Sequence, residues 1–543
     1  MRNRLFALTV VLAAATANAQ WSQFAGNPKH TGAANVIAQP LGREVADIIH
    51  DAFVPQELEA SGGDLLIHYA VPLLDGDDVF MAFKDELVIG PFTPITVWGV
   101  KRHHWENGKL VQKWTVFTDW RPVPDIGWEP PMQPVLANGF IYVPDFGATL
   151  LQVNRDTGVS VRRINPFATT DETIYMSGPP SADAAGNIIY GAFRANRDAP
   201  LTSDVTGAWL VRVTPDATAT AVPFATLVTS APAANAQCTS HFQFGSVRLP
   251  PSPNAVALSI TCGSQRPGIN IAPAIAADGT IYVVSRAHLN DRWGYLVAVN
   301  PDLTPKWTAS LRQRFHDGCD VLLPAGTCSA GAHTGVDPTD NLPGSGVVTD
   351  LSTASPVVLP DGTILYGTFT GYNDSNGHLT HFSAAGAYLG AYPFGWDTTP
   401  AVWQHNGTFS VVTKHNFYGF ALRPDPGEFI VQLDPNLNKE WEYRNPSTRI
   451  CHGGSCVQNE FGFEWCVNAA AIDANGTIFA NAEDGILYAI GQGGVLLDRM
   501  ALGGPLGAAY TPVAIDAQGR IYAQAGGHLY AVGGPYPRRR AVR

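Results

Sequence analysis

Apolar and polar residues alternate with a period of two, in short runs, along most of the chain. The stretch AIDANGTIFANAEDGILYAIG, at Ala471–Gly491, has an apolar run, an Asp-x-x-Gly turn, an alternating run, a Gly turn and a third run. A closely similar stretch, AIDAQGRIYAQAGGHLYAVG, follows at Ala514–Gly533. A period of two with Asp and Gly at the turns predicts three strands joined by two hairpins, and not a helix.

Copies of this unit continue towards the N-terminus, so that the chain holds about eight of them. Several units end in a further strand that contains a tryptophan, as at Trp114, Trp307 and Trp441. This predicts an all-β chain folded as a single β-propeller of about eight four-stranded blades, with about seven as the alternative, because a closed ring protects its edge strands. The other copies lie at Gln133–Gly158, Pro179–Phe193, Ala272–Ser285 and Ser355–Phe369, with weaker ones at Ala70–Phe83 and Thr399–Val412.

The first residues and two kinds of repeat carry a resemblance to a known family. WSQFAGNPKHTGAANV at Trp21–Val36, and units such as SPVVLPDGTILYGTF and DGILYAI, resemble pyrroloquinoline-quinone-like β-propellers, the quinoprotein alcohol dehydrogenase-like family. The resemblance spans almost the whole chain after the first residues. It implies the ring fold, and a strand near Trp21 that completes the last blade. The family includes dehydrogenases and a non-enzymatic outer-membrane assembly lipoprotein, so the fold does not fix the function.

The cofactor marks of the dehydrogenases are not matched in this sequence. Those enzymes have a vicinal cysteine pair over the quinone, and often a Cys-x-x-Cys-His haem motif, whereas here no two cysteines are adjacent and no such motif occurs. The cofactor is therefore left open, with quinone and calcium as a less favoured alternative. LDGDDVF, around Asp75–Asp78, lacks the loop of a calcium site, so a hairpin turn is expected there.

The ends of the chain and its charge indicate the compartment and exclude one class of partner. Arg2 and Arg4 precede the apolar run Leu5–Ala15, which is typical of a secretory signal peptide over residues 1–19. We therefore expect an exported, periplasmic or extracellular protein, with the propeller at 20–534, a basic tail at 535–543 and no transmembrane segment. A net charge of −12 without a basic patch argues against nucleic acid. A monomer that binds a protein, a glycan or a small molecule is expected.

Seven cysteines lie in long segments that lack a strand pattern, which predicts disulfides in an exported protein. Sequence proximity predicts the pairs Cys238–Cys262 and Cys319–Cys328. Cys451 could pair with Cys456 or Cys466, and we assign it to Cys466. We expect no metal site, since disulfides are favoured over a zinc site formed by Cys451, His452, Cys456 and Cys466.

Polar side chains in or beside the inserted loops are the candidates for chemistry at the mouth of the channel. Histidine and carboxylate are the residue types for acid–base work, and the carboxylate of Glu464 between aromatic residues is the hardest to explain as purely structural. A salt-bridged hairpin, a disulfide loop and a capped turn are the structural alternatives for the others. The candidate catalytic residues are His288, His316, Asp397 and Glu464, and the candidate binding residues are Arg286, Trp396, Glu460 and Asn468.

Two functions follow from these observations, and the sequence leaves open whether the protein is an enzyme. The favoured hypothesis is an exported binding or assembly platform, with Trp98, Trp105, Trp120 and Trp128 as contact anchors in one stretch. The alternative is an enzyme at the channel mouth, either a divergent quinoprotein oxidoreductase or a lyase or hydrolase. Convergence of the four candidate catalytic residues in one cavity would favour the enzyme.

Overall fold

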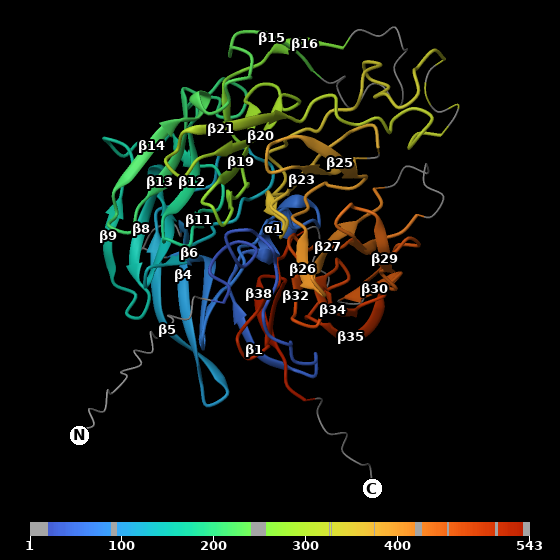
Figure 1. Cartoon of the computed structure of the whole chain (residues 1–543). Coiled ribbons are helices and arrows are strands. Elements are labelled where there is room, and N and C mark those ends of the chain that lie inside the picture. Colours follow the sequence, from blue (N-terminus) through green and yellow to red (C-terminus); the bar gives the residue numbers. More distant parts are fainter. Residues whose placement is uncertain are drawn as a thin grey trace, which may run out of the picture.

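The computed structural model describes residues 20–87, 95–240, 257–324, 326, 328, 330–373, 375–418, 426–452, 455–504 and 509–535. Within these ranges six sheets have four strands and two have five, and the sheets follow one another around a ring (Figure 1). The protein is therefore an all-β, eight-bladed propeller, as predicted. The proposed signal peptide at 1–19 and the tail beyond Pro535 lie outside the described residues.

The first four blades are antiparallel sheets built from consecutive strands. Blade 1 has β2 (Leu73–Asp75), β3 (Asp78–Leu87), β4 (Ile95–Glu106) and β5 (Lys109–Thr118). Blade 2 has β6 (Val135–Ala137), β7 (Phe140–Asp145), β8 (Thr149–Asn154) and β9 (Ser160–Ile164). Blade 3 has β10 (Ile174–Met176), β11 (Ser181–Ala182), β12 (Ile188–Arg194), β13 (Gly207–Val213) and β14 (Ala219–Pro223). Blade 4 has β17 (Gln265–Pro267), β18 (Ala274–Ile275), β19 (Ile281–Ala287), β20 (Gly294–Val299) and β21 (Pro305–Ser310).

The second half of the ring repeats this order. Blade 5 has β22 (Val357–Val358), β23 (Ile364–Thr368), β24 (His378–Phe382) and β25 (Tyr388–Tyr392). Blade 6 has β26 (Ala401–His405), β27 (Thr408–His415), β28 (Phe429–Leu433) and β29 (Lys439–Arg444). Blade 7 has β32 (Ala471–Ile472), β33 (Ile478–Asn481), β34 (Ile486–Gly491) and β35 (Val495–Ala501). Blade 8 has β36 (Ala514–Ile515), β37 (Ile521–Ala525), β38 (His528–Val532) and, from the N-terminal part, β1 (Glu44–Ile49).

The ring is closed by an N-terminal strand, but this strand is not the one near Trp21. β1 pairs antiparallel with β38, from Glu44 opposite Val532 to Ile49 opposite His528. Trp21 instead pairs with Leu74 on the inner strand of blade 1. The resemblance therefore predicted correctly that an N-terminal strand completes the last blade, but wrongly that this strand lies near Trp21. The Trp21 segment instead turns into the channel.

Residues 21–39 run around the inside of the ring and bond to the inner strand, or the turn that follows it, in each blade. The Pro28 carbonyl accepts the Ile275 amide of blade 4, and the Lys29 and Thr31 carbonyls accept amides of blades 5 and 6. This segment, which we call the inner girdle, ties the blades together through backbone hydrogen bonds inside the channel, and in blade 3 through the side chain of Gln23. The bonded pairs are Trp21–Leu74, Ser22–Leu136, Gln23–Ala182, Pro28–Ile275, Lys29–Val358, Thr31–Val402, Gly32–Ile472 and Gln39–Gly519.

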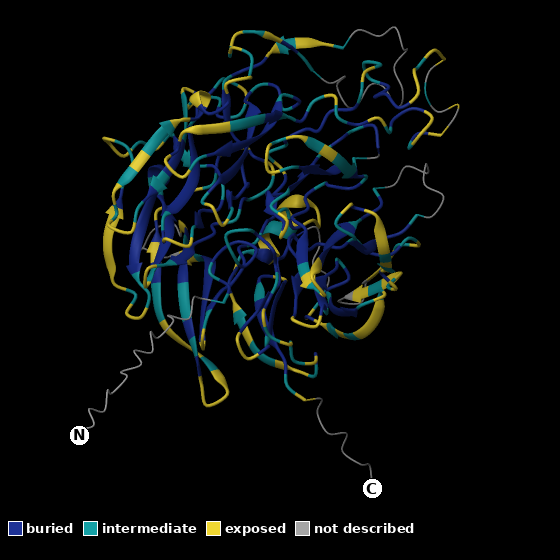
Figure 2. Cartoon of the chain, in the orientation of Figure 1, coloured by how far each residue is buried: buried dark blue, intermediate teal, exposed yellow. Residues whose placement is uncertain are grey.

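Tryptophans of the outer strands lock neighbouring blades together. Trp114 on β5 donates from Nε1 to the Arg155 carbonyl of blade 2 at 3.1 Å, and Trp307 on β21 donates to the Ala384 carbonyl of blade 5 at 2.9 Å. Gly158, at φ +73°, lies so close to Trp114 that a Cβ there would be 2.6 Å from its Cγ. The inner and middle strands of the ring are buried and the outer strands are exposed, as Figure 2 shows along its rim.

A short segment at residues 50–69, which we call the cap, continues from β1 and contains helix α1 (Val54–Ser61). α1 is drawn near the centre of the ring in Figure 1. Isolated bridges join Ile67 to Glu129 before blade 2, and His68 to Tyr510 before blade 8. The cap therefore crosses the channel mouth between the loops that enter two blades. No helix in the described ranges is both long and apolar enough to span a bilayer.

Disulfides hold the inserted loops, two of them as predicted. Cys238 pairs with Cys262 next to the hairpin β15 (Gln237–Thr239) and β16 (Ser259–Thr261), and Cys319 pairs with Cys328. The assignment of Cys451 to Cys466 is wrong: Cys451 pairs with Cys456 across the hairpin β30 (Arg449–His452) and β31 (Ser455–Gln458), where they face each other. Cys466 is buried in front of blade 7 and lies outside the three disulfides.

Candidate functional site

The loops that enter the blades and those that join second to third strands lie on one face of the ring, which we call the loop face. Asp397, in the loop that enters blade 6, is at the centre of the mouth and is 1% exposed. Its Oδ1 accepts hydrogen bonds from the Thr353 amide at 2.6 Å, from the Thr353 hydroxyl at 3.0 Å and from Asn468 Nδ2 at 3.0 Å. Its Oδ2 lies 3.3 Å from Nε2 of His68. The carboxylate is therefore saturated by the protein's own donors.

His68 extends from the cap to Asp397, and its ring packs against two aromatic residues. The ring of His68 is 5.0 Å from Trp128 and 5.5 Å from Tyr510, with which it is stacked. Burial alone would raise the pKa of Asp397, but the charges of His68 and Lys414 and the Thr353 amide outweigh burial and lower it below its usual value. The mouth thus holds a buried contact between a carboxylate and an imidazole, packed against aromatic rings.

Lys414, near the end of β27, is a buried lysine at the mouth. The residue is 2% exposed, its Nζ lies 4.2 Å from the centre of the Tyr510 ring, and Nζ has no hydrogen-bond partner among the described residues. Burial lowers its pKa, against the raising effect of Asp397, Cys466 and Glu464. Burial also raises the pKa of Glu464 to about 7, which the charge of Lys414 only partly offsets. Burial and the nearby Glu464 raise the pKa of Glu483 to about 8.

Three of the predicted site residues therefore meet at the mouth. Asp397 and Asn468 share a hydrogen bond, and Glu464 interacts electrostatically with the same Lys414 that faces Asp397. His68 and Lys414 are functional candidates that sequence reasoning missed. No sequence motif marks either residue. The cap has no strand alternation, and Lys414 lies near the end of an ordinary apolar strand.

His288 and Arg286 belong to a different cluster, on blade 4. Nε of Arg266 donates to Nδ1 of His288 at 2.7 Å, and Arg286 and Arg266 both pair with Asp350. Burial and the two arginines lower the pKa of His288 to about 4. A neutral imidazole that accepts from a buried guanidinium has a positioning role here, and it holds the end of β19 against the loop that enters blade 5.

The remaining candidates lie apart from the mouth cluster. His316 is exposed in the disulfide loop, where its neighbour Asp317 pairs with His378 at 2.6 Å. Glu460 is exposed, and Trp396 packs edge-on against Phe369 at 5.2 Å. The four candidate catalytic residues thus do not converge in one cavity.

An open cleft of about 540 Å³ lies off the axis on the loop face, over blades 1 to 3. Trp98, near the start of β4, and Trp120, just after β5, stand edge to face with ring centres 5.5 Å apart. Tyr175 and Met176 on β10 of blade 3 also line the cleft, with side chains partly exposed. The other lining residues are Arg121, Pro122, Pro124, Asp145, Phe146, Gly147, Ala148, Glu172, Thr173, Ile174, Ala195, Asn196 and Arg197.

The tryptophans that the sequence suggested as contact anchors divide into three environments. Trp98 and Trp120 line the cleft, and Trp128 joins the aromatic stack of the mouth. Trp105 does not serve as an anchor: it is buried between blades 1 and 8, and its Nε1 donates to the Tyr522 hydroxyl at 2.7 Å. Its position on a blade-to-blade contact explains the difference.

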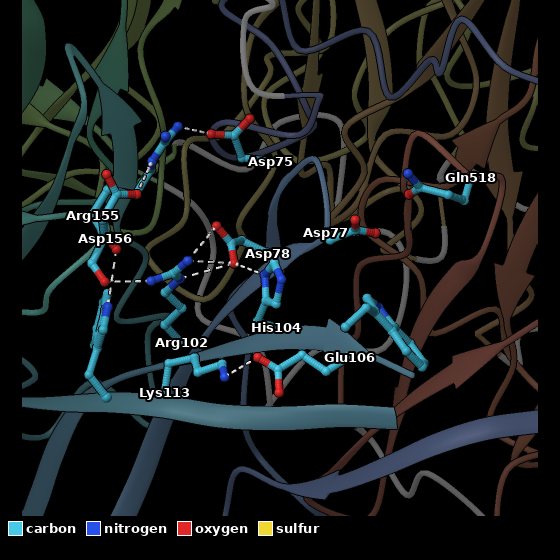
Figure 3. Close-up of polar contacts among 12 residues, drawn as sticks. Asp75, Asp77, Asp78, Arg102, His104, Glu106, Lys113, Arg155, Asp156 and Gln518 are labelled. Carbon is cyan, nitrogen blue, oxygen red and sulfur yellow. Dashed lines mark hydrogen bonds and ion pairs between the residues drawn. The ribbon is translucent and has the colours of Figure 1, made fainter. Parts of the chain in front are cut away.

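The face opposite the loop face carries an ion-pair network at the turn Asp75–Asp78, shown in Figure 3. Asp78 accepts from Nε and Nη2 of Arg102, both at 3.0 Å, and from His104 at 2.7 Å. Asp75 pairs with Arg155 of blade 2, so the network joins two blades. The turn closes the β2–β3 hairpin with Asp75 opposite Asp78, which is the expected hairpin.

The donor set at the mouth does not fit the calcium and quinone that this fold binds in the dehydrogenases. The side-chain oxygen Oδ1 of Asn468 already accepts a hydrogen bond from the Thr399 amide at 2.8 Å. Both carboxylate oxygens of Asp397 face groups of the protein. The charge of Lys414 acts on Asp397 and would repel a metal ion, and Nε2 of His68 is turned to Asp397 at 3.3 Å. We therefore derive no chemistry through that cofactor.

Comparison with known proteins supports the fold at low sequence identity. No family model and no curated protein matches the chain. A europium-containing methanol dehydrogenase superimposes with a TM-score of 0.53 at 10% identity, over 93% of this chain and 89% of that one. A quinohemoprotein alcohol dehydrogenase from Pseudomonas putida has a TM-score of 0.49 at 11% identity, covering 96% and 82%. BamB from Moraxella catarrhalis has 0.42 at 11%, covering 91% and 99%. The protein has the quinoprotein-like propeller fold.

Proposed function

We propose that this protein is an exported binding propeller that holds a small ligand in the cleft at Trp98 and Trp120. The cleft is the observation that carries the proposal, because it is open and concave, and its exposed surface is mostly apolar, with aromatic, proline and methionine side chains in the lining. Its volume of about 540 Å³ is in the range of small-molecule sites and too small for a protein face. At the mouth, in contrast, the carboxylate of Asp397 already accepts hydrogen bonds from the protein's own groups.

Export is part of the proposal and is supported by the three disulfides. Disulfides persist in oxidising compartments and are rare in the cytosol. The N-terminal sequence has the charge and apolar pattern of a secretory signal. A binding protein outside the cytosol would meet its ligand in the surrounding medium.

Saturation-transfer NMR with a small-molecule fragment library tests the binding function. Fragments that bind the wild-type protein should lose their signal with Trp98→Ala and with Tyr175→Ala, which remove lining side chains from blades 1 and 3. Trp293→Ala is the matched control, because Trp293 is also half-buried under an arginine, Arg312, but lies on blade 4. Thermal unfolding by circular dichroism checks that each variant is folded. Fragments unaffected by both cleft variants would contradict the proposal.

A catalytic function at the mouth is the second candidate, favoured by one observation. Lys414 and Glu464 have pKa values displaced towards each other by burial, and such pairs are typical of acid–base sites. The reaction would be a lyase or hydrolase step on a small molecule. Wild-type protein and Lys414→Met are incubated with a small-molecule extract and compared by mass spectrometry. A compound consumed only by the wild type supports catalysis, and identical profiles contradict it.

A further inference from the structure

We propose that the cleft selects a monocarboxylate with a flat apolar body, and that Arg121 binds its carboxylate. This inference rests on the proposed function and names the ligand class of the same site. It follows from the balance of charge around the cleft, from the way Arg121 is held and from the apolar walls.

Arg121 is the one cation of the cleft without a carboxylate partner among the described residues. Asp145, buried in the wall, is paired with Arg163 at 2.6 Å and accepts the Thr118 hydroxyl and the Asp119 amide, both at 2.9 Å. At the rim Glu172 and Arg197 pair with each other. A single positive charge therefore remains for a ligand. A doubly charged phosphate would be only half neutralised, so the balance favours a monoanion.

Two contacts hold the Arg121 guanidinium at the cleft wall. Its Nη1 donates to the Trp120 carbonyl at 2.6 Å, and its central carbon lies 5.4 Å from the centre of the Trp98 ring. A guanidinium has five N–H donors in one plane, so most of them remain for a ligand. The planar fork matches a carboxylate through two parallel hydrogen bonds. The contact with Trp98 keeps the guanidinium beside the apolar walls.

The walls next to Arg121 require the rest of the ligand to be apolar. Pro122, Phe146, Tyr175 and Met176 line the cleft together with the two tryptophans. Aromatic rings prefer flat partners in offset or edge-to-face contact, and the methionine sulfur adapts to ring edges. An aryl carboxylate satisfies both the apolar walls and the single cation, whereas a neutral sugar would leave Arg121 unpaired.

Isothermal titration calorimetry with two probes of the same shape tests the inference. trans-Cinnamate carries the carboxylate, and cinnamyl alcohol is its neutral counterpart. Cinnamate should bind the purified protein at least tenfold more tightly than the alcohol, since a charge-assisted pair contributes about 1.5–3 kcal/mol. Arg121→Gln should weaken cinnamate about tenfold and leave the alcohol unchanged. Arg312→Gln, which removes the arginine over Trp293, is the matched control and should change neither.

The outcomes separate this inference from the proposed function. Equal affinity for both probes, or an Arg121→Gln variant that still prefers cinnamate, would overturn the carboxylate selection and leave the cleft as a binding site. Binding of both probes that Trp98→Ala does not weaken would place the ligand elsewhere and overturn the proposed function as well. If neither probe binds but cleft-dependent fragments do bind, the assignment of an aryl carboxylate as the ligand is overturned and the proposed binding function stands.

Discussion

Nε2 of His68 lies 3.3 Å from Oδ2 of Asp397, although the two residues enter blades 1 and 6. The contact exists because the cap carries His68 across the mouth, between Glu129 and Tyr510. Both side chains are buried. This contact and the inner girdle place the protein's own residues inside the ring, whereas the off-axis cleft is an open concave site on the loop face.

Asp397→Asn should destabilise the protein by about 2–4 kcal/mol at pH 7, because it removes the counter-charge of the buried Lys414 and the carboxylate that faces His68. The pKa of Asp397 is lowered in the folded protein, so its contribution is present above the unfolded pKa near 4 and is lost as pH falls through lower values. In urea unfolding, the stability difference between wild type and variant should start to narrow as the pH falls below about 4 and keep narrowing towards the lowered folded pKa. The exposed Asp361→Asn is the control, and an equal effect there would contradict the role of burial.

Glu464→Gln should gain stability relative to the wild type as the pH rises. The folded pKa of Glu464 is raised to about 7, so the wild type binds an extra proton when folded and loses stability between the unfolded pKa and pH 7. Between pH 5 and pH 8 the free energy of unfolding of the variant should rise, relative to that of the wild type, by up to about 3 kcal/mol. Urea unfolding at several pH values measures it. Glu460→Gln, four residues earlier and exposed, should show no such trend, and a parallel trend in both would refute the assignment.

Gly158→Ala should cost more stability than Gly139→Ala. Both glycines have a left-handed backbone, at φ +73° and +77°, so each pays about 1–2 kcal/mol for a Cβ. At Gly158 the Cβ also meets the Trp114 ring, whereas at Gly139 no atom lies within 4 Å. The expected difference in the free energy of unfolding is about 1–3 kcal/mol. Equal losses would show that Trp114 is not locked against blade 2.

Peptide mapping without reduction should recover Cys451 and Cys456 linked to each other. Cys466 should react with iodoacetamide only after denaturation, because burial raises the pKa of its thiol and excludes the reagent. A peptide that links Cys451 to Cys466 would contradict the structure of the loop before blade 7.

The blades could be predicted from sequence because their signals are local. The alternation at Ala471–Gly491, the Asp and Gly turns and the outer tryptophans each fall within one unit. The closing strand could not be located, because β1 pairs with β38 at the other end of the chain. The alternation within β1 does not indicate which strand it pairs with. Cys451 had two partners within reach, and only the register of the β30–β31 hairpin decides between them.

The site was predicted in part for the same reason. Asp397, Glu464 and Asn468 stand at blade entrances, which the repeat locates in the sequence. His68 and Lys414 join them through packing between distant blades, and no local pattern reports such packing. Trp98 and Trp105 lie on one strand, β4, yet one lines the cleft and the other is buried against Tyr522. Which neighbour each faces depends on the ring as a whole.

The most direct measurement is a crystal structure of the full chain soaked with trans-cinnamate. We predict density for one cinnamate in the cleft, its ring between Trp98 and Tyr175 and both carboxylate oxygens within hydrogen-bond distance of Arg121. Density beside Lys414 on the axis, or a cleft that stays empty of cinnamate while calorimetry shows binding, would contradict the account.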